Sequence, residues 1–147
     1  MPSAPAVLAE RDAEEWRYGV SRVADMDELL PYLGELLRHH QKSPELMRLW
    51  IELAAAASRP DHPAHAYFVQ RYGKGRRYFA QGMREKADRG ELHGNLAPDH
   101  AAILLQSVLN GLQLQWLLDR DLDIVGPMRA FLDLLFQVNG DGEPGGV

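Results

Sequence analysis

The sequence predicts an all-α fold, a helical bundle of about six helices whose last two form a dimeric four-helix interface with a second copy. Apolar residues recur at helical spacing in six segments, no segment alternates as a strand would, and proline or glycine separates the segments. The 147 residues suit a single domain with a sizeable core. We expect that domain over residues 1–138 and a disordered, glycine-rich tail over residues 139–147.

Three helices are predicted in the first half of the chain. The first covers residues 6–20, which are charged and only weakly amphipathic. The second covers residues 26–41 and carries a stripe of leucines; Pro31 lies about one turn in, so the helix either begins there or kinks. A Ser-Pro-Glu sequence at residues 43–45 combines a cap, a fixed φ and an acid in the first turn, so it predicts a third helix to about residue 58.

Three more helices follow a break at residues 59–63, which contain two prolines. The longest is predicted over residues 63–89 and ends at Gly90, a residue suited to the left-handed conformation after a helix. Three glycines inside this helix predict a bend or a close contact with a neighbour. A proline and an aspartate open the next helix, over residues 98–118, and the last covers residues 125–138.

The last two helices carry more apolar surface than one core can bury. The first of them has a broad apolar face and a second, flatter face with small residues four apart. A helix that is apolar on nearly all sides must be buried on more than one, and a second copy of the chain covers it most simply; the alternative is a central core helix in a monomer. The sequence predicts a homodimer interface that contains Ile103, Ser107, Gly111, Leu114, Leu118, Met128, Phe131 and Leu135.

Composition excludes several classes of function. The chain has no cysteine, so disulfides and thiolate metal sites are excluded and a cytoplasmic location is favoured. No apolar run reaches the ~18 residues of a membrane span, and no signal peptide is visible, so we expect no membrane association. The formal net charge of -5 argues against nucleic-acid binding by this chain alone.

No catalytic, metal or cofactor site is predicted. No serine lies in a Gly-x-Ser-x-Gly elbow, and no glycine-rich phosphate loop is present. His39 and His40 are adjacent and diverge on a helix, while His62 and His65 lie three apart without a third ligand at matching spacing. The basic run at residues 71–77 fits a solvated helix face better than a phosphate contact.

Three segments, in order, resemble a known family. The run NGLQLQWLLD at residues 110–119 resembles the penultimate helix of actinobacterial TetR-type transcriptional regulators. The run DHPAHAYF at residues 61–68, followed by Arg71 and Tyr72, resembles the start of their long central helix. Residues 44–54 resemble the helix before it, so the resemblance extends over about residues 25–138.

This resemblance implies an effector-binding and dimerisation domain, in which the middle helices enclose a pocket and the last two form the dimer. Such regulators begin with a basic helix-turn-helix unit, whereas this chain opens at what resembles the connecting helix. We therefore expect DNA contact only through a helix-turn-helix domain that this chain lacks. The implied function is the sensing of a small-molecule effector; a helical scaffold or adaptor is the alternative, and a small helical enzyme a more distant one.

The ligand-binding residues are predicted from the inward apolar and aromatic positions of the middle helices. An apolar lining with few fixed charges suggests a small, mostly hydrophobic effector. Each such residue can equally be ordinary core. The predicted ligand-binding set is Met47, Trp50, Phe68, Tyr72, Met83, Leu104 and Val108.

Overall fold

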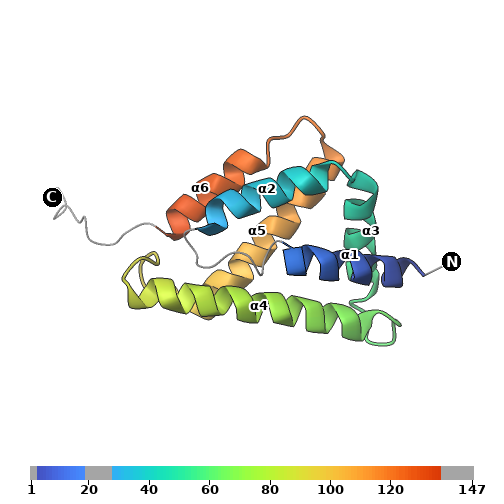
Figure 1. Cartoon of the computed structure of the whole chain (residues 1–147), viewed down its shortest axis with the longest axis horizontal. Coiled ribbons are helices and arrows are strands. Elements are labelled where there is room, and N and C mark those ends of the chain that lie inside the picture. The colour runs from blue at the N-terminus through green and yellow to red at the C-terminus, as the bar shows by residue number, and fades with distance from the viewer. Residues whose placement is uncertain (1–2, 19–27, 137–147) are drawn as a thin grey trace.

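The computed structural model describes residues 3–18 and 28–136, and it confirms the all-α fold (Figure 1). These residues form six helices and no strand. The helices are α1 (Ala4–Tyr18), α2 (Leu29–Gln41), α3 (Pro44–Ala56), α4 (His65–Asp88), α5 (Pro98–Leu118) and α6 (Val125–Leu135).

Proline and glycine set the helix boundaries where the sequence predicts them. α2 begins at Leu29, so Pro31 lies in its first turn, where the missing N–H has no intrahelical acceptor to lose. α3 and α5 each begin with a proline, although Ser43 before α3 makes no side-chain hydrogen bond to its first turn. Gly90 follows α4 with a φ of +71°, as a left-handed terminating residue does.

Three predicted helices are shorter in the structure. α3 ends at Ala56 rather than residue 58, where Ser58 Oγ donates a 2.6 Å hydrogen bond to the Ala55 carbonyl. Such local side-chain bonding competes with helix continuation. α4 begins at His65 and ends at Asp88, and α6 ends at Leu135. The predicted tail, residues 139–147, lies outside the described residues.

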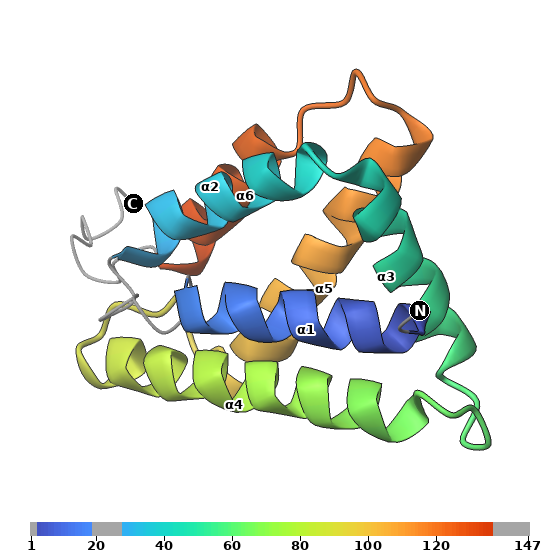
Figure 2. The same ribbon diagram turned by 45° about the vertical axis from the view of Figure 1, so that its right-hand side comes forward.

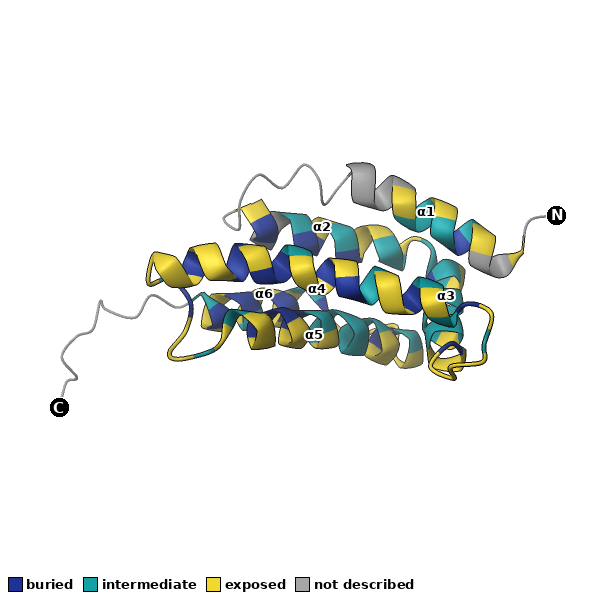
Figure 3. Ribbon diagram, turned by 90° about the horizontal axis from the view of Figure 1, so that it is seen from below, coloured by how far each residue is buried: buried dark blue, intermediate teal, exposed yellow. Residues whose placement is uncertain are grey.

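α5 contacts α3, α4 and α6 (Figure 1). Its pairing with the long helix α4 is the most extensive, while α2 packs beside α6 (Figure 2). Seen from below, α1 and α5 lie at opposite sides of the bundle, with α2 and α4 between them (Figure 3). α1 therefore covers the side of the bundle that faces away from α5 (Figure 3).

The main core lies between α2, α4, α5 and α6. Its largest fully buried side chains are Leu29, Leu33, Leu37, Met83, Leu105, Ile124, Met128 and Leu132. A smaller cluster at the other end contains Ala57, Ala64 and Phe68, with Trp50 and Tyr67 packed against it. Burial of leucine-sized side chains stabilises a fold by roughly 1.5–3 kcal/mol each, so the main core holds the bundle together.

The two helices predicted to form the dimer interface differ in which residues they expose. On α5 the predicted face is outward: Ile103 and Leu114 are exposed and Leu118 is 81% exposed. On α6, Met128 and Leu135 are only 1% and 4% exposed, so the core of the protomer already covers these two predicted interface residues. These two side chains and Leu132 repeat every three to four residues on the face that meets the core, because α6 packs against α2 and α5.

The outward apolar surface of α6 is instead carried by Leu134, which is 63% exposed. Phe131 is partly buried and packs against the core. We call the outward residues of α5 and α6 the outer apolar surface, defined by the exposed Ile103, Leu104, Ser107, Leu114, Leu118 and Leu134 and the half-buried Gly111.

In the described part of the chain, α5 is the one helix that is long and apolar enough by composition to span a membrane. This is weak evidence for a membrane, because core helices of other proteins have the same composition. Ala101, Ala102, Leu105 and Trp116 of α5 are buried in the core. Val108, Leu109, Leu112 and Leu117 are partly buried against that core, and Ile103, Leu104, Leu114 and Leu118 belong to the outer apolar surface.

Candidate ligand cavity

A cavity of about 170 Å³ lies between the first five helices and opens partly to solvent. α1 contributes Leu8, Arg11 and Asp12; α2 contributes Tyr32, Leu33, Leu36, His39 and His40; Ser43 and the α3 residues Leu46, Met47 and Trp50 follow; α4 contributes Arg71, Tyr72 and Phe79; α5 contributes Gln106, Leu109, Asn110 and Gln113. An apolar cavity of ~150 Å³ can hold a benzene molecule, so this cavity has the volume for a compound built on one ring.

Three of the predicted ligand-binding residues line the cavity: Met47, Trp50 and Tyr72. They come from α3 and α4, which the sequence predicted to enclose a pocket. The glycines Gly73, Gly75 and Gly82 of α4 are all buried. Whether the three lining residues bind a ligand stays a prediction.

The other four predicted residues do not line the cavity. Phe68 lies in the smaller apolar cluster, one layer behind Trp50, and Met83 is fully buried in the main core. Val108 packs against that core, whereas Leu104 points outward and is 44% exposed. Helical spacing predicts which face of a helix a residue lies on. Which of the inward residues line a cavity depends on how the helices pack against one another.

Trp50 is held in place by other aromatic rings. Its ring centroid lies 5.0 Å from that of Phe68, with an interplanar angle of 68°. Tyr67 and Tyr72 lie at centroid distances of 6.4 Å each. Edge-to-face pairs at such distances are favourable, so the indole forms a fixed wall of the cavity.

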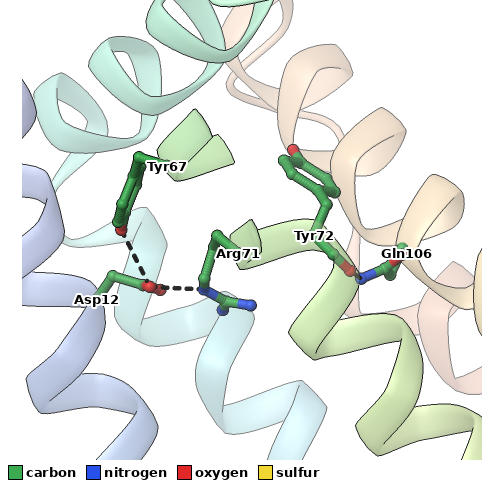
Figure 4. A network of polar contacts seen from close by, with 5 residues as sticks. All are labelled: Asp12, Tyr67, Arg71, Tyr72 and Gln106. Atoms are coloured by element: carbon green, nitrogen blue, oxygen red, sulfur yellow. Dashed lines mark hydrogen bonds and ion pairs between the residues drawn. The ribbon is translucent and has the colours of Figure 1, made fainter. Parts of the chain in front are cut away.

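One polar network joins α1 to α4 (Figure 4), and its members Tyr67 and Arg71 both lie next to the Trp50 ring. Asp12 Oδ2 accepts a 2.5 Å hydrogen bond from Arg71 Nε and a 3.1 Å hydrogen bond from the Tyr67 hydroxyl. Burial is the largest cause that raises the pKa of Tyr67, followed by the charge of Asp12 and the hydrogen bond to it, while Arg71 acts in the opposite direction. The phenol therefore stays protonated and donates to Asp12.

A second polar network joins α2 to α5. His40 Nδ1 lies 3.2 Å from Gln113 Oε1, and Gln113 Nε2 donates a 3.2 Å hydrogen bond to the Leu109 carbonyl. Because an amide oxygen only accepts, Nδ1 is the nitrogen of His40 that carries a proton. Asp12 and Arg71 of the first network and His40 and Gln113 of the second all line the cavity.

Gly75 permits a close approach between α4 and α5. A Cβ at this position would lie 2.6 Å from Gln106 Nε2 and 3.3 Å from Arg71 Nη1. Gln106 Nε2 donates a 3.1 Å hydrogen bond to the Tyr72 carbonyl (Figure 4). The sequence predicted a bend or a close contact near this glycine, and the structure has the close contact.

Sequence reasoning missed most of the polar lining. Gln106, Asn110 and Gln113 line the cavity. From helical spacing they were interpreted only as residues that separate two apolar faces of α5. Their spacing of four and three residues puts them on one stripe, which could have been read as the wall of a cavity. Arg11 and Asp12 gave no signal, because a charged, weakly amphipathic helix normally lies in solvent. The lining thus contains three charged side chains, Arg11, Asp12 and Arg71, that were not in the predicted ligand-binding set.

Nothing in the described part of the chain groups three or more histidine, aspartate or glutamate side chains as a metal site would. His39 and His40 both line the cavity, with ring centroids 6.2 Å apart. His65 Nδ1 lies 2.8 Å from the Ala57 carbonyl, and His62 Nδ1 accepts a hydrogen bond from the Ala64 N–H. The latter pair therefore serves the turn before α4.

Comparison with known proteins identifies the domain. Residues 26–136 match the family model described as BetI-type transcriptional repressor, C-terminal. No curated protein and no solved structure matches the chain significantly. The matched region contains α2 to α6, including most of the cavity and the whole outer apolar surface. Domains of this family regulate transcription, are not enzymes, and in general dimerise and bind small-molecule effectors. The chain therefore belongs to the TetR-type transcriptional regulators, as a C-terminal regulatory domain of the BetI type.

Proposed function

We propose that this domain senses a small, mostly hydrophobic molecule in the cavity and acts as a homodimer in a cytoplasmic transcriptional regulator. The observation that carries the proposal is the aromatic-walled cavity inside a domain of this family. A binding site of this kind is concave, mainly apolar and furnished with a few polar groups that fix orientation. The cavity has these properties.

The cavity limits the size of the effector. Its volume of about 170 Å³ is below the ~300 Å³ at which pockets for drug-sized ligands begin. Tyr32, Trp50, Tyr72 and Phe79 supply aromatic surface to a flat ring. We expect a ligand with one ring or an aliphatic body of similar size.

A small aromatic compound should raise the melting temperature and quench the fluorescence of Trp50. Anything that binds only the folded state stabilises it, by about 2.7 kcal/mol at a hundred times Kd. The test measures thermal shift and tryptophan fluorescence with toluene, benzyl alcohol, benzamide and benzoate. In Trp50→Phe the quenching should disappear while a thermal shift remains.

Trp116 provides the internal control, because it is buried in the core and does not line the cavity. Its fluorescence should be unchanged by the same compounds. If none of the four compounds shifts the melting temperature, or if the quenching persists in Trp50→Phe, the cavity is not a ligand site for molecules of this class.

The outer apolar surface supports the homodimer. Ile103, Leu104, Leu114, Leu118 and Leu134 are large apolar side chains exposed to solvent on the two adjacent helices. Several large apolar side chains exposed on neighbouring helices are typical of an interaction surface. A two-fold arrangement would pair the same surface of each protomer.

Residues 1–147 by themselves should not bind duplex DNA specifically. Their formal net charge is -5, and specific recognition needs a basic surface and an element that enters a groove. Gel-shift assays should give at most weak complexes that disappear near ~0.2 M salt, where phosphate contacts are screened. A complex that survives this salt and distinguishes between sequences would contradict the prediction.

A further inference from the structure

The cavity has the opposite charge balance to the chain around it. Among its described lining residues, Arg11 and Arg71 are cations, Asp12 is the one carboxylate, and none is a lysine or a glutamate. The chain as a whole carries a formal charge of -5. A cation-rich cavity in an acidic domain is an electrostatic environment that favours an anion.

Arg71 combines charge with geometry suited to a carboxylate. Its side chain is about three-quarters shielded from solvent, and its Nε donates to Asp12 Oδ2 at 2.5 Å. A guanidinium presents five N–H donors in a plane and binds carboxylates through two parallel hydrogen bonds. Partial burial strengthens such contacts, because solvent screens them less.

A second donor lies beside Arg71. Arg71 Nη1 and Gln106 Nε2 both lie close to the backbone of Gly75, and both residues line the cavity. Gln106 Nε2 is oriented by its hydrogen bond to the Tyr72 carbonyl. A guanidinium and an oriented amide thus lie near each other beside Gly75, and both residues line the cavity.

Trp50 argues against a cationic ligand. The guanidinium carbon of Arg71 lies 5.9 Å from the centroid of the Trp50 ring. The ring face that would attract a ligand cation is therefore next to a cation of the protein itself. An ammonium group placed there would be repelled by Arg71.

We propose that the effector is a small organic anion, a carboxylate on a one-ring or similar apolar body, whose anionic group binds at Arg71 and Gln106. The apolar body lies against Trp50, Tyr72 and Phe79. This inference rests on the proposed ligand-sensing function and names the chemical class of the ligand. Asp12 competes with the ligand carboxylate for Arg71, since both are anions that the same guanidinium can hold.

Three probes with the same ring separate charge from shape: benzoate, benzamide and benzyltrimethylammonium. Isothermal titration calorimetry with the full chain should give a Kd for benzoate about tenfold or more below that for benzamide, because charge-assisted hydrogen bonds are the stronger ones. The cation should bind most weakly. This comparison uses the unmodified protein, so it does not depend on the folding of any variant.

Two variants assign the preference to Arg71. In Arg71→Gln the Kd of benzoate should rise to that of benzamide, about tenfold, while benzamide is unaffected. In Asp12→Asn the competing carboxylate is gone, so benzoate should bind more tightly and benzamide as before. Arg76→Gln removes the same charge from an exposed position of α4 outside the cavity, and should leave the benzoate preference unchanged.

The outcomes distinguish this inference from the proposed function. Equal affinities for benzoate and benzamide, or tighter binding of the cation, would overturn the anion proposal while the cavity remains a ligand site. A benzoate preference that survives Arg71→Gln would overturn the assignment to Arg71. If none of the probes binds and none of the compounds tested for the proposed function does, both proposals are wrong.

Discussion

Replacing Gly111 by arginine is expected to dissociate the homodimer while each protomer stays folded. Gly111 lies in the middle of the predicted α5 interface, and a Cβ built on it meets no atom within 4 Å. The protomer therefore has room for a larger side chain, and arginine is also a better helix former than glycine. In the dimer the same side chain would place two charges where the helices approach.

The expected size of this effect follows from the cost of an unpaired charge. Removing a charged group from water without a partner costs about 3 kcal/mol or more, which weakens the dimer at least roughly a hundredfold. Light scattering or sedimentation across protein concentrations would measure it. Circular dichroism should show unchanged helix content.

Val69→Arg is the matched control for Gly111→Arg. Val69 is an exposed apolar residue of α4, outside the outer apolar surface, so the variant adds the same charge elsewhere. It should dimerise as the unmodified chain does. A stable homodimer should be formed at a protein concentration of roughly tens of micromolar. An unmodified chain that is monomeric at this concentration would refute the homodimer. If Gly111→Arg remains fully dimeric, the dimer interface does not contain Gly111.

Met128→Ala is expected to lower the free energy of unfolding by about 2–5 kcal/mol, the range for truncating a buried methionine to alanine. Met128 is 1% exposed and packs in the main core with Leu132 and Ile124. Truncation leaves a void that the surrounding side chains fill only in part. Denaturant unfolding of the chain would measure the change.

Leu134→Ala separates a core role from an interface role on the same helix. Leu134 is 63% exposed, so its truncation should leave the stability of the protomer within about 0.5 kcal/mol and weaken only the dimer. The loss in Met128→Ala should be the same at every protein concentration, whereas any loss in Leu134→Ala should depend on concentration. If the two variants exchange these behaviours, Met128 is an interface residue after all.

Only a small part of the candidate site could be predicted from the sequence, since Met47, Trp50 and Tyr72 are the predicted residues among its lining. Large aromatic side chains on an inward helix face identified Trp50 and Tyr72, because such residues have to be buried somewhere. Asp12 and Arg71 could not be predicted as partners, because the hydrogen bond between them joins residues 59 positions apart. No local pattern encodes a contact between helices so distant in the chain.

The sequence by itself determined where the helices lie. Pro44 and Pro98 begin α3 and α5, and Gly90 follows α4 in the left-handed conformation, as expected from their backbone properties. These are local effects: a ring that fixes φ and removes a donor, and a residue without Cβ, act in any surroundings. The large number of apolar residues on α5 and α6 could likewise be read from each segment alone.

Only the tertiary structure decided which apolar face turns inward and what borders the cavity. α6 is apolar on most of its circumference, so periodicity alone could not tell Met128 and Leu135 from Leu134. Packing against α2 buries the first two and leaves the third in solvent. In the same way, α1 brings Arg11 and Asp12 over the cavity through a bond to α4. Burial depends on neighbours that are distant in sequence, and a helical pattern specifies a face without specifying what it meets.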